Sequence, residues 1–279
     1  MKFVLISLFV LSSGVAFAQS DTVAAGKKAE PVSYVPKLDG TIKAKMEVDL
    51  NGGEYRFSVR NARLGIRGNV SPKMNYRLQM DFGNEGKISL LDAYAGYQSG
   101  GFTAELGQQQ YHFSTDMDRG PSTNLFANRS FLSKYGGKTV DYVRTLGSRD
   151  LGAFFSYRFA SKLPLKLLAG VFNGSGNNNP VWGKHVNVIG RAELGGSEGL
   201  QGAVAYYDGY APQHTRVVER EGENVTENFE QKMRMAGFEL RYVRGKFRIE
   251  GEYARRYLGT GSSSEVMAVA VVQGFYRFD

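Results

Sequence analysis

Four arginines recur at short intervals between Tyr55 and Asn69, and the residues between them are largely apolar. Successive side chains of a β-strand point to opposite faces, so this alternation would give one strand a guanidinium face and an apolar face. A planar guanidinium group can donate two hydrogen bonds to one oxyanion, so such a face suits phosphate-like ligands. The pattern fits a soluble protein with a basic face in water, or a membrane protein with one face toward lipid and the other toward a water-filled channel. The residues are Arg56, Arg60, Arg63 and Arg67.

The alternation slips by one residue at Arg60 and Asn61, as a single β-bulge would cause. With that bulge, all of these arginines point to the same side. The segment before them, residues 42–50, alternates in the same way and places Lys43 and Lys45 opposite its apolar side chains. A short Asn-Gly-Gly turn joins the two segments, which predicts a β-hairpin.

Composition narrows the class of protein. The 279-residue chain carries 35 Lys and Arg against 27 Asp and Glu, a formal net charge of +8. This balance favours anionic partners, namely nucleic acid, lipid headgroups or small anions. The chain has no cysteine, which excludes a disulfide framework and a thiolate metal site. Its 16 Tyr, 18 Phe and 35 Gly, with 7 Pro, favour an all-β protein over a helical one.

The N-terminus has the form of a secretory signal peptide. Lys2 precedes a short apolar run, and Ala16 and Ala18 form an Ala-x-Ala site, so we expect residues 1–18 to be removed on export. Residues 19–37 are polar and small, typical of a flexible N-terminal segment. Export argues against nucleic acid as a partner and against a cytoplasmic enzyme. Because no later segment is long and apolar enough for a spanning helix, membrane insertion would require a β-barrel.

Alternating segments continue to the C-terminus and predict about twelve strands of about 9–11 residues each. Some connections are tight turns, and others are long and polar, as expected of the two rims of an outer-membrane barrel. Arginine on the lipid face near the bilayer midplane costs about 2–4 kcal/mol, so a barrel would turn the arginines toward its lumen. We therefore predict an all-β, antiparallel transmembrane β-barrel over residues 38–279, with a soluble periplasmic β-sandwich as the alternative. The long connections are residues 111–147, 173–182 and 209–231.

Several segments, in order, resemble the phosphate-selective porin O and P family of Gram-negative outer membranes. The resemblance implies a homotrimeric channel in the cell outer membrane that allows passive diffusion of small anions, with phosphate as the candidate solute. It implies no enzymatic activity and no cofactor. A full family barrel has about sixteen strands, so the resemblance also implies a shortened or truncated member or a twelve-strand variant. The segments, over residues 38–176, are RFSVRNARLGIRGNVSPKMNYRLQMDF, LLDAYAGY, AELGQQQYHFSTD, LFANRSF, RDLGAFFSY and AGVFNGSG.

The resemblance also assigns site residues. The wall of the channel would carry the four arginines above and Arg77. Lys43 and Lys45, on the charged face of residues 42–50, would add two further cations to it. An inward-folding constriction loop would run from about Asp116 to Gly147, a length that favours a functional loop over an ordinary connection. The loop charges could instead lie outside the pore. Asp92 would face the lumen and lower its positive electrostatic potential, or serve as a structural hydrogen-bond acceptor. The basic residues of the loop are Arg119, Arg129, Lys134, Lys138 and Arg144.

Two other functions fit parts of the sequence. A barrel without transport could act as an anchor or adhesin that binds through residues 209–231. His112 and Ser114 lie two residues apart, an arrangement that outer-membrane hydrolases use, although this spacing also arises by chance. No group of residues has the spacing of metal ligands.

Overall fold

The computed structural model describes residues 32–49, 52–84, 87–119, 149–160, 164–180, 182–220, 223–260 and 263–276. Within these ranges the chain forms twelve β-strands and one short helix. The first strands are β1 (Lys37–Asp49), β2 (Glu54–Asn69), β3 (Met74–Asn84), β4 (Lys87–Ser99) and β5 (Phe102–Gln110), and helix α1 (Thr115–Asp118) follows them. The others are β6 (Arg149–Arg158), β7 (Leu165–Phe172), β8 (Asn187–Leu194), β9 (Gly199–Arg220), β10 (Glu223–Arg244), β11 (Phe247–Thr260) and β12 (Ser263–Tyr276).

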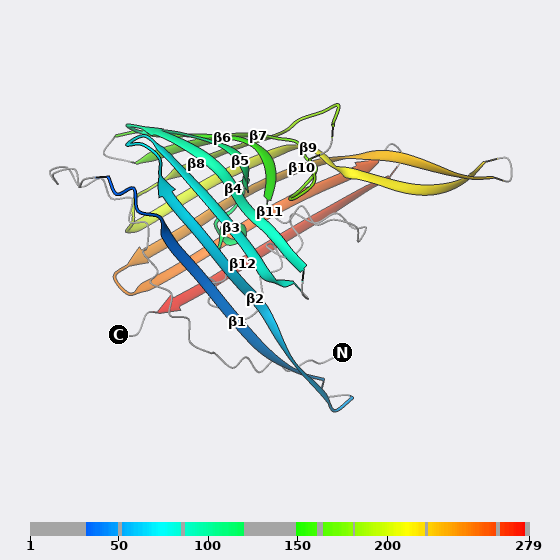
Figure 1. Cartoon of the computed structure of the whole chain (residues 1–279), viewed down its shortest axis with the longest axis horizontal. Helices are drawn as coiled ribbons and strands as arrows, with labels where there is room; N and C mark the ends of the chain where they lie inside the picture. The colour runs from blue at the N-terminus through cyan, green and yellow to red at the C-terminus, as the bar shows by residue number, and fades with distance from the viewer. Residues whose placement is uncertain are drawn as a thin grey trace. The chain divides into compact units, whose positions relative to one another are not determined.

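The strands form one antiparallel sheet in chain order, β1 to β12, as Figure 1 shows. The prediction of an all-β fold with about twelve antiparallel strands is therefore confirmed. Among the residues that the structure describes, no helix is long and apolar enough to span a membrane. The predicted signal peptide, residues 1–18, lies outside the described residues.

Connection lengths differ between the two rims of the sheet. The connections after β2, β4, β6, β8 and β10 are all short, whereas those after β5 and β7 are long. Because successive connections of an antiparallel meander alternate between rims, the short connections after β1, β3, β9 and β11 share a rim with the long ones. The expectation that tight turns lie on one rim and long loops on the other is therefore wrong for these four connections. We call the rim with the long connections the loop rim and the opposite one the turn rim.

Residues 209–231 were expected to form a long loop, and this expectation is wrong as well. Strands β9 and β10 each have 22 residues, and they pair as far as Arg220 with Glu223. Figure 1 shows this hairpin running well beyond its neighbours β8 and β11. Its polar sequence hides strand character, because it lacks the apolar alternation by which a half-buried strand is recognised.

The chain forms two compact units. The N-terminal unit holds the described residues up to Ala95, which form β1 to β3 and most of β4. The C-terminal unit holds the residues from Gly96 to Asp118 and the described residues from Arg149 onward.

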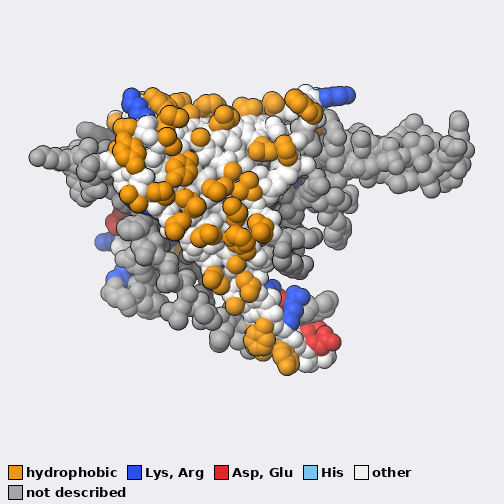
Figure 2. Space-filling view, in the orientation of Figure 1, with side chains coloured by type: hydrophobic (Ala, Val, Ile, Leu, Met, Phe, Trp, Pro, Cys, Tyr) orange, Lys and Arg blue, Asp and Glu red, His pale blue; other side chains and the backbone are white. Residues whose placement is uncertain are grey.

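In the N-terminal unit, strand β2 contains the predicted β-bulge. Lys43 pairs with Asn61 and Ala44 pairs with Val59, so Arg60 is the extra residue. The side chains of Phe57 and Leu64 are 73% and 49% exposed on the face opposite the arginines. Figure 2 shows apolar side chains spread over the face of β1 to β4 that is turned to the viewer. This face has the composition expected of a lipid-contacting surface.

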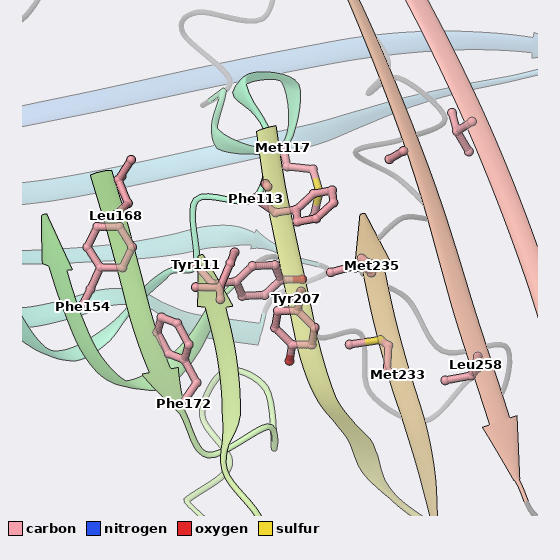
Figure 3. Packing of buried hydrophobic residues seen from close by; sticks show 14 residues of the cluster. Tyr111, Phe113, Met117, Phe154, Leu168, Phe172, Tyr207, Met233, Met235 and Leu258 are labelled. Carbon is pink, nitrogen blue, oxygen red and sulfur yellow. The ribbon is translucent and has the colours of Figure 1, made fainter. Parts of the chain in front are cut away.

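The C-terminal unit has a packed core on the other face of its sheet. The Tyr111 ring lies 6.2 Å from the Phe172 ring and 5.4 Å from the Tyr207 ring, between centroids. Figure 3 shows these rings with Met233 and Met235 of β10 beside them. Tyr111 belongs to the segment after β5, so this segment lies against the sheet and is buried by it.

Candidate functional site

The strand registers of the N-terminal unit place the predicted wall residues on one face. In an antiparallel pair, directly opposite residues point to the same side. Glu47 lies opposite Arg56, and Lys43 lies opposite Asn61 beside the bulge at Arg60. Together these registers give one charged face, which we call the arginine wall. It consists of Lys43, Lys45, Arg56, Arg60, Arg63, Arg67 and Arg77, with Asp39, Glu47, Asp81 and Asp92 among them.

Several wall cations are neutralised by carboxylates. Arg63 Nε donates to Asp81 Oδ2 at 2.9 Å, and both side chains are nearly buried. Arg56 Nε and Lys45 Nζ each lie 2.6 Å from a carboxylate oxygen of Glu47. These cations already have a charged partner, so their attraction for a further anion is reduced.

Arg77 is held by two carboxylates. Its Nη1 lies 3.0 Å from Asp39 Oδ2, and its Nε lies 3.3 Å from Asp92 Oδ2. A Cβ on Gly65 would overlap Asp39 Oδ1, so the glycine leaves the space that the carboxylate needs. Asp92 therefore accepts a hydrogen bond from a wall arginine and pairs with its charge, so the contact fits both roles expected of Asp92.

Arg60 and Arg67 differ from the other wall arginines. Within the described part of the chain, neither has an ion-pair partner. Arg67 lies directly opposite Arg77, and its Nε is buried without a hydrogen-bond partner. Arg60 protrudes from the bulge close to Lys43, another cation. Like charges at short distance and an unpaired donor favour an anion at these positions.

The segment between β5 and α1 is bound to the charged face of the C-terminal unit. Arg191 Nη1 of β8 donates to the carbonyl oxygen of Phe113 at 2.7 Å and to Glu239 Oε1 at 2.5 Å. Arg241 Nη2 donates to Thr115 Oγ1 at 2.9 Å. A Cβ on Gly237 would lie 3.0 Å from the Phe113 ring, so this glycine makes room for the segment.

Two carboxylates bind the N-terminus of α1. Glu239 accepts hydrogen bonds from Thr115 N at 3.0 Å and from Thr115 Oγ1 at 2.7 Å. Glu252 accepts one from Asp116 N at 3.0 Å. The first N–H groups of a helix have no partner within the helix, so these glutamates satisfy them. Glu239, which pairs with Arg191, also places negative charge at the positive end of the helix. The sequence did not reveal these residues, because they lie on β10 and β11, far along the chain.

The predicted constriction-loop residues divide into two groups. Asp116 and Arg119 are described, and Asp116 is bound as above. Arg129, Lys134, Lys138 and Arg144 lie outside the described residues, as does residue 147 at the end of the predicted loop.

The proposed hydrolase pair has structural partners instead. His112 Nδ1 lies 2.9 Å from Asp118 Oδ2. Burial opposes charging of this imidazole, but the Asp118 carboxylate outweighs it and raises the pKa of His112. Ser114 Oγ accepts a hydrogen bond from Met117 N at 3.1 Å and so caps the turn of α1. Both residues therefore help to shape the segment.

Asp150 on β6 organises the connection after β7. Its carboxylate accepts hydrogen bonds from Leu151 N and Gly174 N, both at 2.8 Å. Gly174 has φ +76°, a backbone conformation that glycine adopts without strain. Asn178 N donates to Gln108 Oε1 at 2.7 Å, which fixes the other end of the turn. The start of this connection is therefore folded against the sheet.

Replacing Asp150 with alanine should lower the free energy of unfolding by about 2 kcal/mol, because the buried N–H group of Gly174 and the partly buried one of Leu151 lose their acceptor. Thermal unfolding in detergent, followed by the mobility of unheated samples on gels, measures the effect. Asp150→Asn keeps one acceptor oxygen and should lose about half as much. Equal stability of both variants and the wild type would contradict the role of Asp150.

Comparisons with known proteins agree with this architecture. The family model of phosphate-selective porin O and P matches residues 43–193, more than half of the chain. No curated protein sequence matches significantly. The fold is similar to that of OmpT, an outer membrane protein of Vibrio cholerae, in its in-vitro folded form, with TM-score 0.53, 14% identity and coverage of 88% of this chain and 71% of that one. It is also similar to outer-membrane expressed OmpT, with TM-score 0.54, 11% identity and coverage of 87% and 70%.

At these identities the structural similarity establishes the fold, which matches outer-membrane porin barrels. The family assignment depends on the model match, which covers the arginine wall and continues as far as β8. Porins are channels without enzymatic activity. The chain belongs to the phosphate-selective porin O and P family of outer-membrane proteins.

Proposed function

We propose that the protein allows passive diffusion of small anions across the outer membrane, along the arginine wall. One observation carries the proposal: the wall holds two guanidinium groups, Arg60 and Arg67, that form no ion pair with a carboxylate among the described residues. The opposite face of the same strands is apolar and exposed, which suits lipid. The wall would then face water. Phosphate, after which the family is named, is the candidate solute because guanidinium groups match its oxygens.

In the proposed mechanism, the wall cations attract the permeating anion but bind it weakly enough for it to leave. Two unit charges about 4 Å apart interact by about 1 kcal/mol in water and about 4 kcal/mol near a protein surface. A solvated anion beside Arg60 would experience a value between these limits, which concentrates anions and repels cations. Conduction also requires that the anion leave, so neighbouring sites of similar strength are favourable. Arg60 with Lys43, and then Arg67, would provide two such sites along one strand.

The remaining parts of the channel are inferred from the family. The segment from Tyr111 to Asp118 would be the fixed beginning of the constriction loop, and Arg119, Arg129, Lys134, Lys138 and Arg144 would add positive charge to it. Assembly as a homotrimer, cleavage after residue 18 and a flexible segment over residues 19–37 remain predictions. Native mass spectrometry of the purified protein measures both the subunit number and the mature mass.

Reconstitution in a planar bilayer under a KCl gradient tests the proposed function. The reversal potential should have the sign of chloride preference, and added phosphate should lower the chloride current by competing for the wall. Cation preference would contradict an anion channel lined by the arginine wall. An anion preference that phosphate does not affect would reject phosphate as the solute.

A second candidate is a barrel without transport, acting as an anchor or adhesin. The packed core around Tyr111 and Tyr207 favours it, since it fills space on the charged face of the C-terminal unit. This candidate predicts no conductance from correctly folded protein and binding through the β9–β10 hairpin.

A further inference from the structure

The outward face of the C-terminal unit carries a group of cations that the arginine wall does not include. Lys232 and Arg234 on β10 alternate with the buried Met233 and Met235, so they point to the exposed face. Arg255 on β11 is exposed between the buried Ala254 and Arg256. Tyr206, Tyr210 and Tyr257 lie on the same face. We call these three cations and three tyrosines the outer basic patch.

The strand registers bring the patch together. Arg234 lies opposite Tyr257 on one side and opposite Asp208 on the other. Arg255 is two residues from Tyr257, so it is the diagonal neighbour of Arg234, at about 7–8 Å between backbone positions. Two guanidinium groups therefore lie close together on an exposed surface.

The patch has more positive than negative charge. Asp208 pairs with Lys232, and its Oδ2 accepts from Arg234 Nε at 3.1 Å. Lys232 Nζ also lies 4.6 Å from the centre of the Tyr210 ring. Asp208 is the only carboxylate that the structure describes in contact with these cations, so three positive groups face one negative group. The side chain of Arg234 is still 54% exposed, which leaves part of its guanidinium for another oxyanion.

The height of the patch matches a membrane boundary. Ten residues separate Arg234 from the end of β10 at Arg244, on the turn rim. At about 3.3 Å per residue and a tilt of about 40°, this is a rise of about 25 Å, the height of the apolar band of an outer-membrane barrel. The outward side chains below the patch are apolar, among them Val204, Phe238 and Leu240. Cations and tyrosines at this level meet headgroups, while the surface beneath meets acyl chains.

We propose that the outer basic patch binds the phosphate group of an anionic lipid in the outer leaflet. The loop rim carries the long connections, which in outer-membrane barrels are extracellular, so the patch lies on the outer-leaflet side. Arg234 and Arg255 would clamp the phosphate oxygens, and the tyrosines would lie along the boundary between headgroup and acyl chain. The proposal depends on the outer-membrane location of the family and not on anion conduction.

Native mass spectrometry of the full protein, titrated with bis-phosphorylated lipid A in a zwitterionic detergent, tests the proposal. Arg234→Gln with Arg255→Gln should weaken lipid binding by about tenfold, because charge-assisted hydrogen bonds to the phosphate are lost. Asp208→Asn should strengthen binding, because it frees Arg234 from its carboxylate. The matched control is Arg244→Gln with Lys246→Gln, which removes two cations at the turn rim and should leave binding unchanged.

Further binding measurements identify the ligand. Lipid A without phosphate should bind as weakly to the wild type as phosphorylated lipid A binds to the double variant. Millimolar inorganic phosphate should not displace the lipid. If inorganic phosphate binds the patch as well as phosphorylated lipid A does, the assignment to a lipid is wrong. If the glutamine variant does not fold, Arg234→Lys with Arg255→Lys replaces it and should show intermediate affinity, since lysine lacks the planar fork.

Equal lipid affinity of the double variant and the wild type, or equal losses in the double variant and the turn-rim control, would overturn the proposal. The same double variant should keep the anion preference of the channel. Failure of the lipid site and failure of anion conduction are therefore separate results.

Discussion

Replacing Arg60 and Arg67 together with glutamine should lower the anion-over-cation permeability ratio of the reconstituted channel by about tenfold. The reason is that neither guanidinium group forms an ion pair with a carboxylate in the described structure, so more of their charge acts on passing ions than at the paired arginines. A loss of about 1.4 kcal/mol of attraction corresponds to that factor. This energy lies between the values for a charge pair in water and one near a protein surface.

The reversal potential under a KCl gradient measures the change, and single-channel conductance confirms that the variant still forms pores. The matched control is Arg63→Gln with Asp81→Asn, which removes a wall arginine together with its partner at 2.9 Å. This control leaves the net charge of the wall unchanged, so it should keep the selectivity of the wild type. If both variants lose selectivity equally, the unpaired arginines have no special role. If neither does, the ion path lies elsewhere.

Replacing Glu239 with glutamine should lower the free energy of unfolding by about 3 kcal/mol and raise the single-channel conductance. Glu239 and Arg191 are both nearly buried and lie 2.5 Å apart, and loss of one charge of a buried pair leaves the other uncompensated. Glu239 also binds Thr115 through its N–H and its hydroxyl group, so its loss releases the start of α1. The released segment would no longer be fixed against the charged face of the C-terminal unit. The proposed channel should then be wider.

Gel mobility after heating to a series of temperatures measures the stability of the folded barrel, and bilayer recording measures the conductance. Glu193→Gln is the matched control, because Glu193 also binds Arg191, at 2.8 Å, but is 37% exposed. A partly exposed pair contributes about 1 kcal/mol or less, so this control should be close to the wild type. An unchanged melting temperature for Glu239→Gln would show that the pair is not important for stability. Lower stability with unchanged conductance would show that the segment does not restrict the passage.

The strands could be predicted from the sequence because a half-buried strand needs strict alternation. The prediction from alternation was correct for β1 and β2, including the bulge at Arg60, where the alternation itself shifts by one residue. It failed for the outer half of the β9–β10 hairpin, whose polar residues do not alternate with apolar ones. Pattern reasoning detects strands through burial on one face and misses those without it.

The arginine wall could be predicted only in part. Alternation places the arginines on one face but does not show which of them meet a carboxylate. The tight turn after β1 sets the register in which Glu47 faces Arg56, so this one pair could have been found from the hairpin. The pair of Arg63 and Asp81 depends on the register between β2 and β3, which the sequence does not specify. The glutamates that bind α1 could not have been found, because they follow it by more than 100 residues.

The distance along the chain between α1 and its partners has a consequence for biogenesis. Thr115 is bound by Glu239, which is 124 residues later, and Asp116 is bound by Gln273, which is 157 residues later. During assembly, Phe113 can bind Arg191 once β8 has joined the sheet, whereas Thr115 and Asp116 of α1 lack these partners until β10, β11 and β12 have joined it. A chain arrested before that step would therefore leave the start of α1 without its carboxylate and amide partners.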